Sequence, residues 1–172
     1  MPYDISLLDP TTGEILIVPQ HTEGSTFTQG VSFLAELSII FNYGKFYYEH
    51  LDNDQGLYFL NGKTGAETLP VLERCIRSLG TEASVKPFYT LDIYGLIDKK
   101  TPEWFIKLSR EVDSSFWNQP ENSDLKNLAL EKDWLSVSSP YWNPTPGNAG
   151  VALVTLKSWA ELHPSGVWSI KS

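Results

Sequence analysis

Alternating apolar and polar residues at the two ends of the chain predict a small β-sheet. The runs that favour strands are residues 4–8, 14–18, 36–42 and 167–170. Asp9–Gly13 separates the first two, and its proline and glycine preset a turn. In the third run, Leu37, Ile39 and Phe41 fall on one face of a strand. We expect the first three strands to share one sheet, and residues 19–30, rich in Gly, Ser and Thr, to form a loop.

Apolar residues at helical spacing predict two main helices, at about residues 65–79 and 147–162. The first follows Thr64-Gly65-Ala66-Glu67, which has the spacing of a capping box. Pro70 lies inside it and predicts a kink, or a start delayed to Thr68. The second helix follows Thr145-Pro146, a cap and a first-turn proline. Cys75 falls in the apolar stripe of the first helix, so we expect it to be buried and inert.

Residues 81–139 form an insertion between these helices. A helix start at Thr101-Pro102 precedes an apolar stripe of Trp104, Phe105, Leu108 and Val112. The aromatic content of the segment is too high for a flexible linker. Because strands come first and helices later, we expect an α+β fold, with a small antiparallel or mixed sheet packed by two main helices. Residues 1–172 are expected to form a single domain with its core in 1–80 and 140–172.

Composition narrows the classes of partner. The 172 residues are 41% hydrophobic and carry 21 acidic against 13 basic residues, a net charge of −8. The content of apolar residues excludes a disordered chain, and an acidic chain without a basic run is a poor partner for duplex nucleic acid or an anionic membrane. A single cysteine permits no internal disulfide, and the start of the chain lacks a basic segment followed by an apolar one. We therefore expect a cytoplasmic protein.

The segment around Lys63 invites a comparison with phosphate-binding loops. Gly56 and Gly62-Lys63-Thr64 resemble a Walker A motif, but five bulky residues separate the glycines where four belong. A weaker interpretation is an anion site, in which the backbone N–H groups of a helix start and one lysine hold a phosphate. The alternative is a well-capped helix and nothing more.

Two aromatic segments, residues 42–48 and 139–148, suggest a flat ligand. Aromatic faces stack on bases, and helix starts hold phosphates. If both helix starts open on one groove, the aromatic side chains wall a nucleotide pocket, and Lys63→Ala weakens binding while leaving stability almost unchanged. The alternative is that the aromatic residues are packing residues. The candidate ligand-binding residues are Tyr43, Lys45, Tyr47, Lys63, Thr64, Gly65, Tyr141, Trp142 and Asn148.

His50 stands among carboxylates in Glu49–Asp54, an arrangement that suits general acid–base work or a metal. The calcium-loop pattern fails, because counting from Asp52 the glycine comes at the fifth position and Lys63 at the twelfth. The alternative is a polar turn with a surface histidine. No motif calls for a metal or a cofactor.

Several motifs together resemble a family of small proteins encoded by bacteriophages and prophages. They are Asn42-Tyr43 with Tyr47-Tyr48, the run from Tyr58 to Pro70, Tyr141-Trp142 with Gly147-Asn148-Ala149, and His163–Trp168. The resemblance covers residues 1–80 and 140–172, and the insertion departs from the pattern. It implies a phage or bacterial cytoplasmic setting, and it supplies no catalytic residues because the family has no established reaction.

Three functions are therefore considered, of which binding is favoured over catalysis. The first is an accessory protein that binds and sequesters a small anionic, nucleotide-derived ligand and so counters host defence signalling. The second is an inhibitor that binds a host enzyme through its acidic surface or its aromatic insertion. The third is a small hydrolase that uses His50 and a neighbouring carboxylate.

Overall fold

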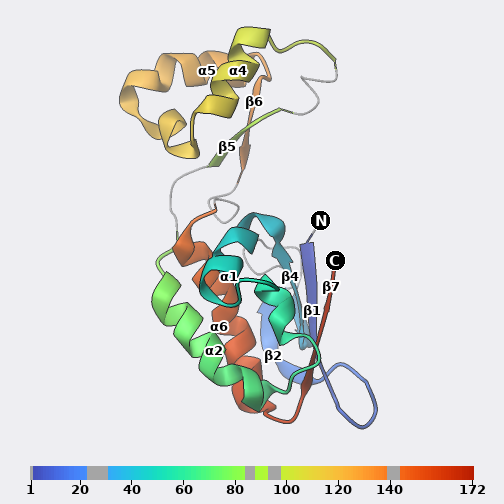
Figure 1. The fold of residues 1–172 in the computed structure, drawn as a ribbon. Helices are drawn as coiled ribbons and strands as arrows, with labels where there is room; N and C mark the ends of the chain where they lie inside the picture. Colours follow the sequence, from blue (N-terminus) through green and yellow to red (C-terminus); the bar gives the residue numbers. More distant parts are fainter. Residues whose placement is uncertain (1, 23–30, 84–87, 93–97, 139–143) are drawn as a thin grey trace. The chain divides into compact units, whose positions relative to one another are not determined.

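The chain divides into two units, each with an apolar core of its own (Figure 1). A computed structural model describes residues 2–22, 31–83, 88–92, 98–138 and 144–172. The first unit comprises residues 1–84 and 144–172, and the second comprises residues 85–143. The second unit thus corresponds to the insertion expected at 81–139, and it has its own small sheet and helices.

The first unit contains a three-stranded antiparallel sheet built from both ends of the chain. The strands are β1 (Pro2–Leu8), β4 (Glu36–Ile40) and β7 (Val167–Lys171), in the order β4-β1-β7. Ile5 pairs with Leu37 on one side and with Ile170 on the other. With helices and antiparallel sheets in one chain, the fold is α+β, which confirms the expected class.

The strand predicted at 14–18 does not join this sheet as a full strand. Its Ile15 forms only an isolated bridge to Leu8, and the chain then continues as β2 (Ile17–Thr22), which pairs with β3 (Val31–Leu34) in a separate two-stranded sheet. Leu16 occupies the branch point, because its N–H donates to the carbonyl of Leu7 and its carbonyl accepts from the N–H of Ala35. Residues 19–22, expected to belong to a loop, are therefore part of a strand, and residues 23–30 of the expected loop lie outside the described residues.

The third predicted strand is also shorter than expected. It ends at Ile40, and the 3-10 helix η1 (Phe41–Tyr43) leads directly into α1 (Gly44–His50). A second 3-10 helix, η2 (Gly56–Leu60), follows. The alternation of apolar residues misled the prediction at Phe41, because the next buried residues, Tyr43, Phe46 and Tyr47, follow a helical spacing.

Two antiparallel helices cover the sheet. They are α2 (Gly65–Leu79) and α6 (Pro146–Leu162), as predicted to within one residue (Figure 1). The capping box at Thr64 and Glu67 is confirmed, and Pro70 lies inside α2 without delaying its start. Glycines allow a very close approach: a Cβ on Gly147 would lie 1.8 Å from the carbonyl oxygen of Glu82, and one on Gly65 would lie 2.7 Å from that of His163.

A buried polar contact ties the sheet to α2. The indole N–H of Trp168, on β7, donates to the hydroxyl of Thr68 at 2.8 Å, and that hydroxyl lies 3.0 Å from the carbonyl oxygen of Gly65. Both side chains are almost fully buried. The polar atoms of a buried tryptophan and a buried threonine are thereby satisfied, which removes the penalty of leaving them without partners.

The second unit packs around aromatic rings. Its elements are β5 (Phe88–Leu91), α4 (Glu103–Glu111), η3 (Ser114–Asn118), η4 (Pro120–Asn122), α5 (Ser123–Glu131) and β6 (Leu135–Ser138). β5 and β6 are antiparallel. The ring of Phe105 is fully buried against Trp117 and Trp134, whereas Trp104, which was assigned to the same stripe, is 54% exposed. None of the helices in the described part of the chain is long and apolar enough to cross a lipid bilayer.

Deleting residues 85–143 and joining the first unit through a short Gly-Ser linker is expected to leave that unit folded. The backbone of Glu82 lies against Gly147, so the two points that flank the insertion are neighbours and little loop-closure entropy is needed. Circular dichroism should show a cooperative thermal transition for the shortened protein. An unfolded or aggregated product would contradict the division into two cores.

Cys75 is fully buried, and burial raises the pKa of its thiol from 9.0 to about 11. The folded state therefore holds the proton more tightly than the unfolded state, so this contribution to stability is complete below about pH 9 and is lost as the pH rises toward 11. We expect the free energy of unfolding in urea to fall more between about pH 8 and 10 in the wild type than in Cys75→Ala. Equal losses, or rapid thiol labelling of the native protein, would contradict this.

Candidate functional site

The start of α2 has no backbone donors left for an anion. The N–H of Gly65 donates to the carbonyl of Gly166 and that of Ala66 to the carbonyl of Pro164, both at 2.8 Å. The N–H of Glu67 donates to the Thr64 hydroxyl at 3.2 Å, and the Thr64 N–H donates to the Glu67 carboxylate, which lowers the pKa of that carboxyl. The predicted anion site gains no support at this end, because the chain itself satisfies the N–H groups of the helix start.

The ammonium group of Lys63 also has its partners within the chain. Its Nζ donates to the carbonyl oxygen of Phe59 at 2.7 Å and lies 4.0 Å from the centre of the Phe59 ring. A hydrogen bond and a cation–π contact together hold the ammonium group against η2. Lys63 thus holds the segment between η2 and α2 against Phe59. The sequence had suggested instead that this lysine binds a phosphate.

The start of α6 is closed by backbone from the end of α2. The Thr145 hydroxyl accepts from the N–H of Asn148 at 3.2 Å, and Asn148 is 1% exposed. A Cβ on Gly150 would lie 1.8 Å from the carbonyl oxygen of Gly80, so residues 80–82 cover this helix end together with Gly147. Backbone of residues 80–82 therefore occupies the space beside Gly147 and Gly150.

The two helix starts lie at opposite ends of the helix pair. Gly65, at the start of α2, lies against Ala160 and His163 at the end of α6, while Gly150, near the start of α6, lies against Gly80. A helix of 15 residues is about 22 Å long. The predicted groove shared by both helix starts is therefore wrong.

The aromatic candidates that the structure describes are packing residues. Tyr43 and Tyr47 are fully buried, and the Tyr47 hydroxyl donates to the carbonyl of Ala149 at 3.1 Å. Burial raises the pKa of Tyr47 well above its ordinary value. The ammonium of Lys45 lies 4.8 Å from the ring of its neighbour Phe46. Tyr141 and Trp142 lie outside the described residues.

His50 is the last residue of α1 and precedes a polar turn. Its Nδ1 lies 2.8 Å from the Ser78 hydroxyl, and its Nε2 is 3.9 Å from the carboxylate of Glu49. The neighbouring Asp52 accepts from the N–H groups of Asp54 and Gln55, as a turn residue does. Among the described residues, no group of three or more His, Cys, Asp or Glu side chains lies close enough together to hold a metal ion.

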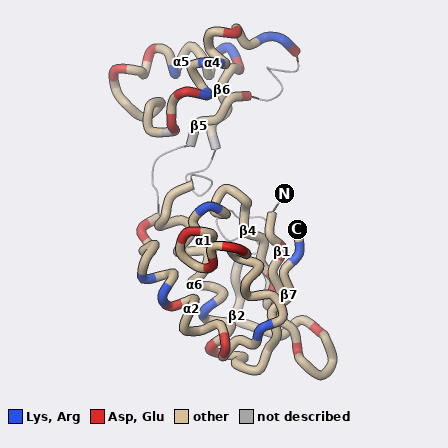
Figure 2. The backbone as a smooth tube through the Cα atoms, viewed as in Figure 1, with Lys and Arg blue, Asp and Glu red and all other residues tan. Residues whose placement is uncertain are grey.

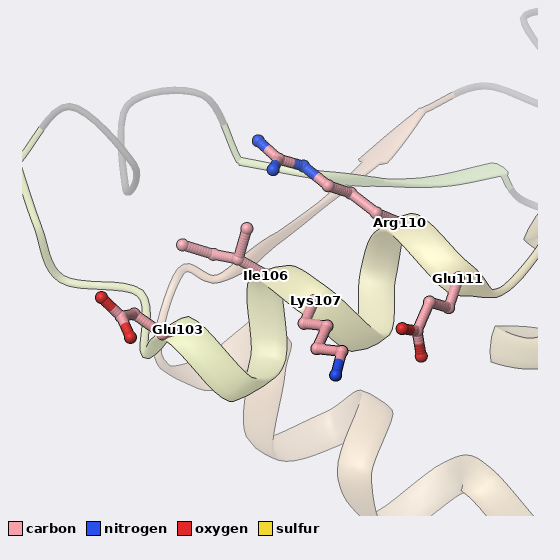
Figure 3. A pocket seen from close by; sticks show the side chains of 5 residues that line it. All are labelled: Glu103, Ile106, Lys107, Arg110 and Glu111. Carbon is pink, nitrogen blue, oxygen red and sulfur yellow. The ribbon is translucent and has the colours of Figure 1, made fainter.

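A hollow on the second unit is lined from a single helix. Figure 3 shows its five labelled side chains, all from α4: Glu103, Ile106, Lys107, Arg110 and Glu111. Arg110 extends to one side of the helix, while Lys107 and Glu111 extend to the other (Figure 3). Because the charged groups diverge, they do not form a binding constellation.

The three most exposed large apolar side chains of the first unit lie on the two-stranded sheet: Ile17 is 73%, Val31 59% and Phe33 58% exposed. Val31 and Phe33 alternate with the buried Ser32 and share one face of β3, whereas Leu34 follows Phe33 and pairs with Ile17 on the other face. We call Val31 and Phe33 the β2–β3 patch. Sequence analysis missed it, although the apolar residues of Val31-Ser32-Phe33-Leu34 carry the signal of a short strand.

The opposite side of the same sheet is fastened to α6. The His21 ring lies 4.9 Å from the Trp159 ring, and its Nε2 is 2.6 Å from the carbonyl oxygen of Leu34. The Nε2 of His163, at the end of α6, lies 2.7 Å from the carbonyl oxygen of Ile17. The strands that carry the patch are thus held in place by side-chain contacts.

No protein-family model, no curated protein and no solved structure matches this chain. The family resemblance proposed from the motifs around Tyr43, Lys63 and Trp168 stays a prediction.

Replacing Lys63 by alanine is expected to lower the free energy of unfolding by about 1 kcal/mol, because it removes one hydrogen bond and one cation–π contact. This reverses the expectation drawn from the pocket hypothesis. Lys171→Ala, at the exposed end of β7, is the matched control and should change stability by less than about 0.5 kcal/mol. Urea denaturation measures both. Equal stabilities for the two variants would show that the Phe59 contacts contribute nothing.

Proposed function

We propose that this chain is a phage or bacterial accessory protein that acts in the cytoplasm by binding another protein. The observation that supports binding of another protein is the exposure of the β2–β3 patch. Single exposed apolar residues are normal on a protein surface, whereas neighbouring ones on one face of a strand are typical of interaction sites. Phe33 and Val31 leave more than half of their surface in water, an arrangement from which a monomer without a partner gains nothing.

The contacts give less support to sequestration of a nucleotide than to binding of a protein. That hypothesis depended on two helix starts in one groove, on a free Lys63 and on aromatic walls. The helix starts are apart and internally bonded, Lys63 is bonded to Phe59, and Tyr43 and Tyr47 are buried. Hydrolysis through His50 has no support either, since the histidine, at the end of α1, contacts Ser78 of α2 and lines none of the described pockets. Binding of a host protein, the second hypothesis, now ranks first.

The rigid support of the patch favours recognition over non-specific adhesion. Ser32 and Val18, which lie on the same strands, are buried, and His21 and His163 hold both strands by their backbone carbonyls. An apolar cluster fixed on a rigid element loses little conformational entropy when a partner covers it. Interfaces of proteins commonly place such clusters, with an aromatic anchor, at their centres.

A photo-crosslinking amino acid placed at Phe33 is expected to capture a specific bacterial protein in a host lysate. The matched control carries the same amino acid at Val154, an exposed residue of α6. Addition of unlabelled wild type should abolish the capture, whereas addition of Phe33→Ser should not. The same set of captured proteins at both positions would contradict the proposal. So would a nucleotide retained by the wild-type protein in native mass spectrometry.

A further inference from the structure

We infer that two copies of this chain associate edge to edge, so that β4 of each copy pairs with β4 of the other and joins their three-stranded sheets. The inference goes beyond the proposed function and does not use the β2–β3 patch. It comes from the backbone of the sheet, in which β4 and β7 flank β1 and form the two outer edges (Figure 1).

The outer edge of β7 is covered by the segment that leads into α2. The N–H of Gly62 donates to the carbonyl of Trp168 at 2.8 Å, and the N–H of Trp168 donates to the carbonyl of Lys63 at 2.9 Å. The N–H of Ile170 donates to the side-chain oxygen of Asn61 at 2.9 Å. These backbone groups of β7 have partners within the chain, and the segment occupies the position that a further strand would take.

The hydrogen bonds of β4 show which of its backbone groups point outward. The N–H of Leu7 donates to the carbonyl of Ala35 at 2.9 Å. In an antiparallel pair, residues that exchange such bonds alternate with residues that do not. Leu37, two residues after Ala35, therefore bonds to β1, whereas the N–H and C=O groups of its neighbours Glu36 and Ser38 point away from β1.

The outward groups of Glu36 and Ser38 have no partner among the described residues. Within that part of the chain, no backbone hydrogen bond outside the strand ladders involves either residue, and the Ser38 hydroxyl donates to the carboxylate of Asp4 on the neighbouring strand. Both residues are partly exposed. Two N–H and two C=O groups thus line the outer edge of β4, and an extended backbone is the ligand that matches such a row.

β4 also lacks the features by which natural sheets keep their edges apart. It contains no lysine, arginine or proline, and its register with β1 runs without a bulge (Figure 2). Its single charged residue, Glu36, stands at its first position. An edge of this kind favours pairing with a further strand.

A second copy of the chain is the occupant that this edge fits. An antiparallel edge is complementary to itself about a two-fold axis, because the donor of each residue meets the acceptor of the residue opposite. With the axis at Leu37, Glu36 lies opposite Ser38 of the second copy, and the two residues exchange both of their backbone bonds. This register satisfies all the outward groups of both residues and places neither glutamate directly opposite the other. The strands then follow the order β7-β1-β4-β4-β1-β7.

The oligomeric state of the full-length chain tests the inference. We expect analytical ultracentrifugation to show a dimer whose population grows with protein concentration up to about 1 mM, where even weak complexes form. Ser38→Pro should abolish the dimer, because proline removes an outward N–H and places its ring on the outer edge without removing a bond to β1. Ser38→Ala is the matched control, since it loses the same hydroxyl contact with Asp4 but keeps the N–H, and it should remain dimeric. Thermal melting verifies that both variants are folded.

Hydrogen exchange of the wild-type chain gives a result that does not depend on the folding of a variant. The amides of Glu36 and Ser38 should become protected as the protein concentration rises, because they gain partners only in the dimer. The amide of Leu37, which is bonded to β1 within one copy, should be protected at every concentration.

A wild-type chain that stays monomeric at about 1 mM would overturn the inference. So would a folded Ser38→Pro variant that still forms the dimer, or a dimer in which the amides of Glu36 and Ser38 exchange freely. Phe33→Ser should remain dimeric, and a dimer lost in this variant but kept in Ser38→Pro would assign the interface to the β2–β3 patch instead.

Discussion

The close antiparallel packing of α2 against α6 is the constraint on which the rest of the first unit depends. It requires glycine where backbone meets backbone, since a Cβ on Gly147 or Gly150 would lie 1.8 Å from a carbonyl oxygen. This approach lets residues 80–82 close one end of the pair and residues 163–166 close the other. Thr68 then meets Trp168, and the sheet is fixed to the helices. The backbone N–H groups at the start of α2 therefore donate to groups of the chain itself.

The location of the candidate site follows from that packing. With the start of α2 bonded internally, backbone of residues 80–82 against the start of α6, and Tyr43 and Tyr47 in the core, the exposed apolar side chains are the surface feature left for recognition. They lie on the short sheet that follows Leu16, whose strands are held by His21 and His163. Lys63, which the sequence suggested as a ligand-binding residue, is thus bonded within the fold, whereas the exposed β2–β3 patch is a feature for which the sequence suggested no role.

The sequence predicted what depends on local chemistry. The capping box at Thr64, the proline at the start of α6 and the apolar stripe through Cys75 each act over one or two helical turns, and the structure confirms them. The sequence could not predict which donors are already used, because the partners of Gly65 and Ala66 lie about 100 residues away at Pro164 and Gly166. The β2–β3 patch was missed for the same reason: the four-residue strand β3 acquires its conformation by pairing with β2, part of which the composition of residues 19–30 assigned to a loop.

The distance between the N-terminal ends of α2 and α6 tests the account most directly. Spin labels at Ala66→Cys and Pro146→Cys, both exposed positions, in a Cys75→Ala background report the distance between the starts of α2 and α6. Because the helices are antiparallel along their length, pulsed electron spin resonance should give a distance of about 20–30 Å. A distance below about 15 Å would place both helix starts at one groove and would contradict the account.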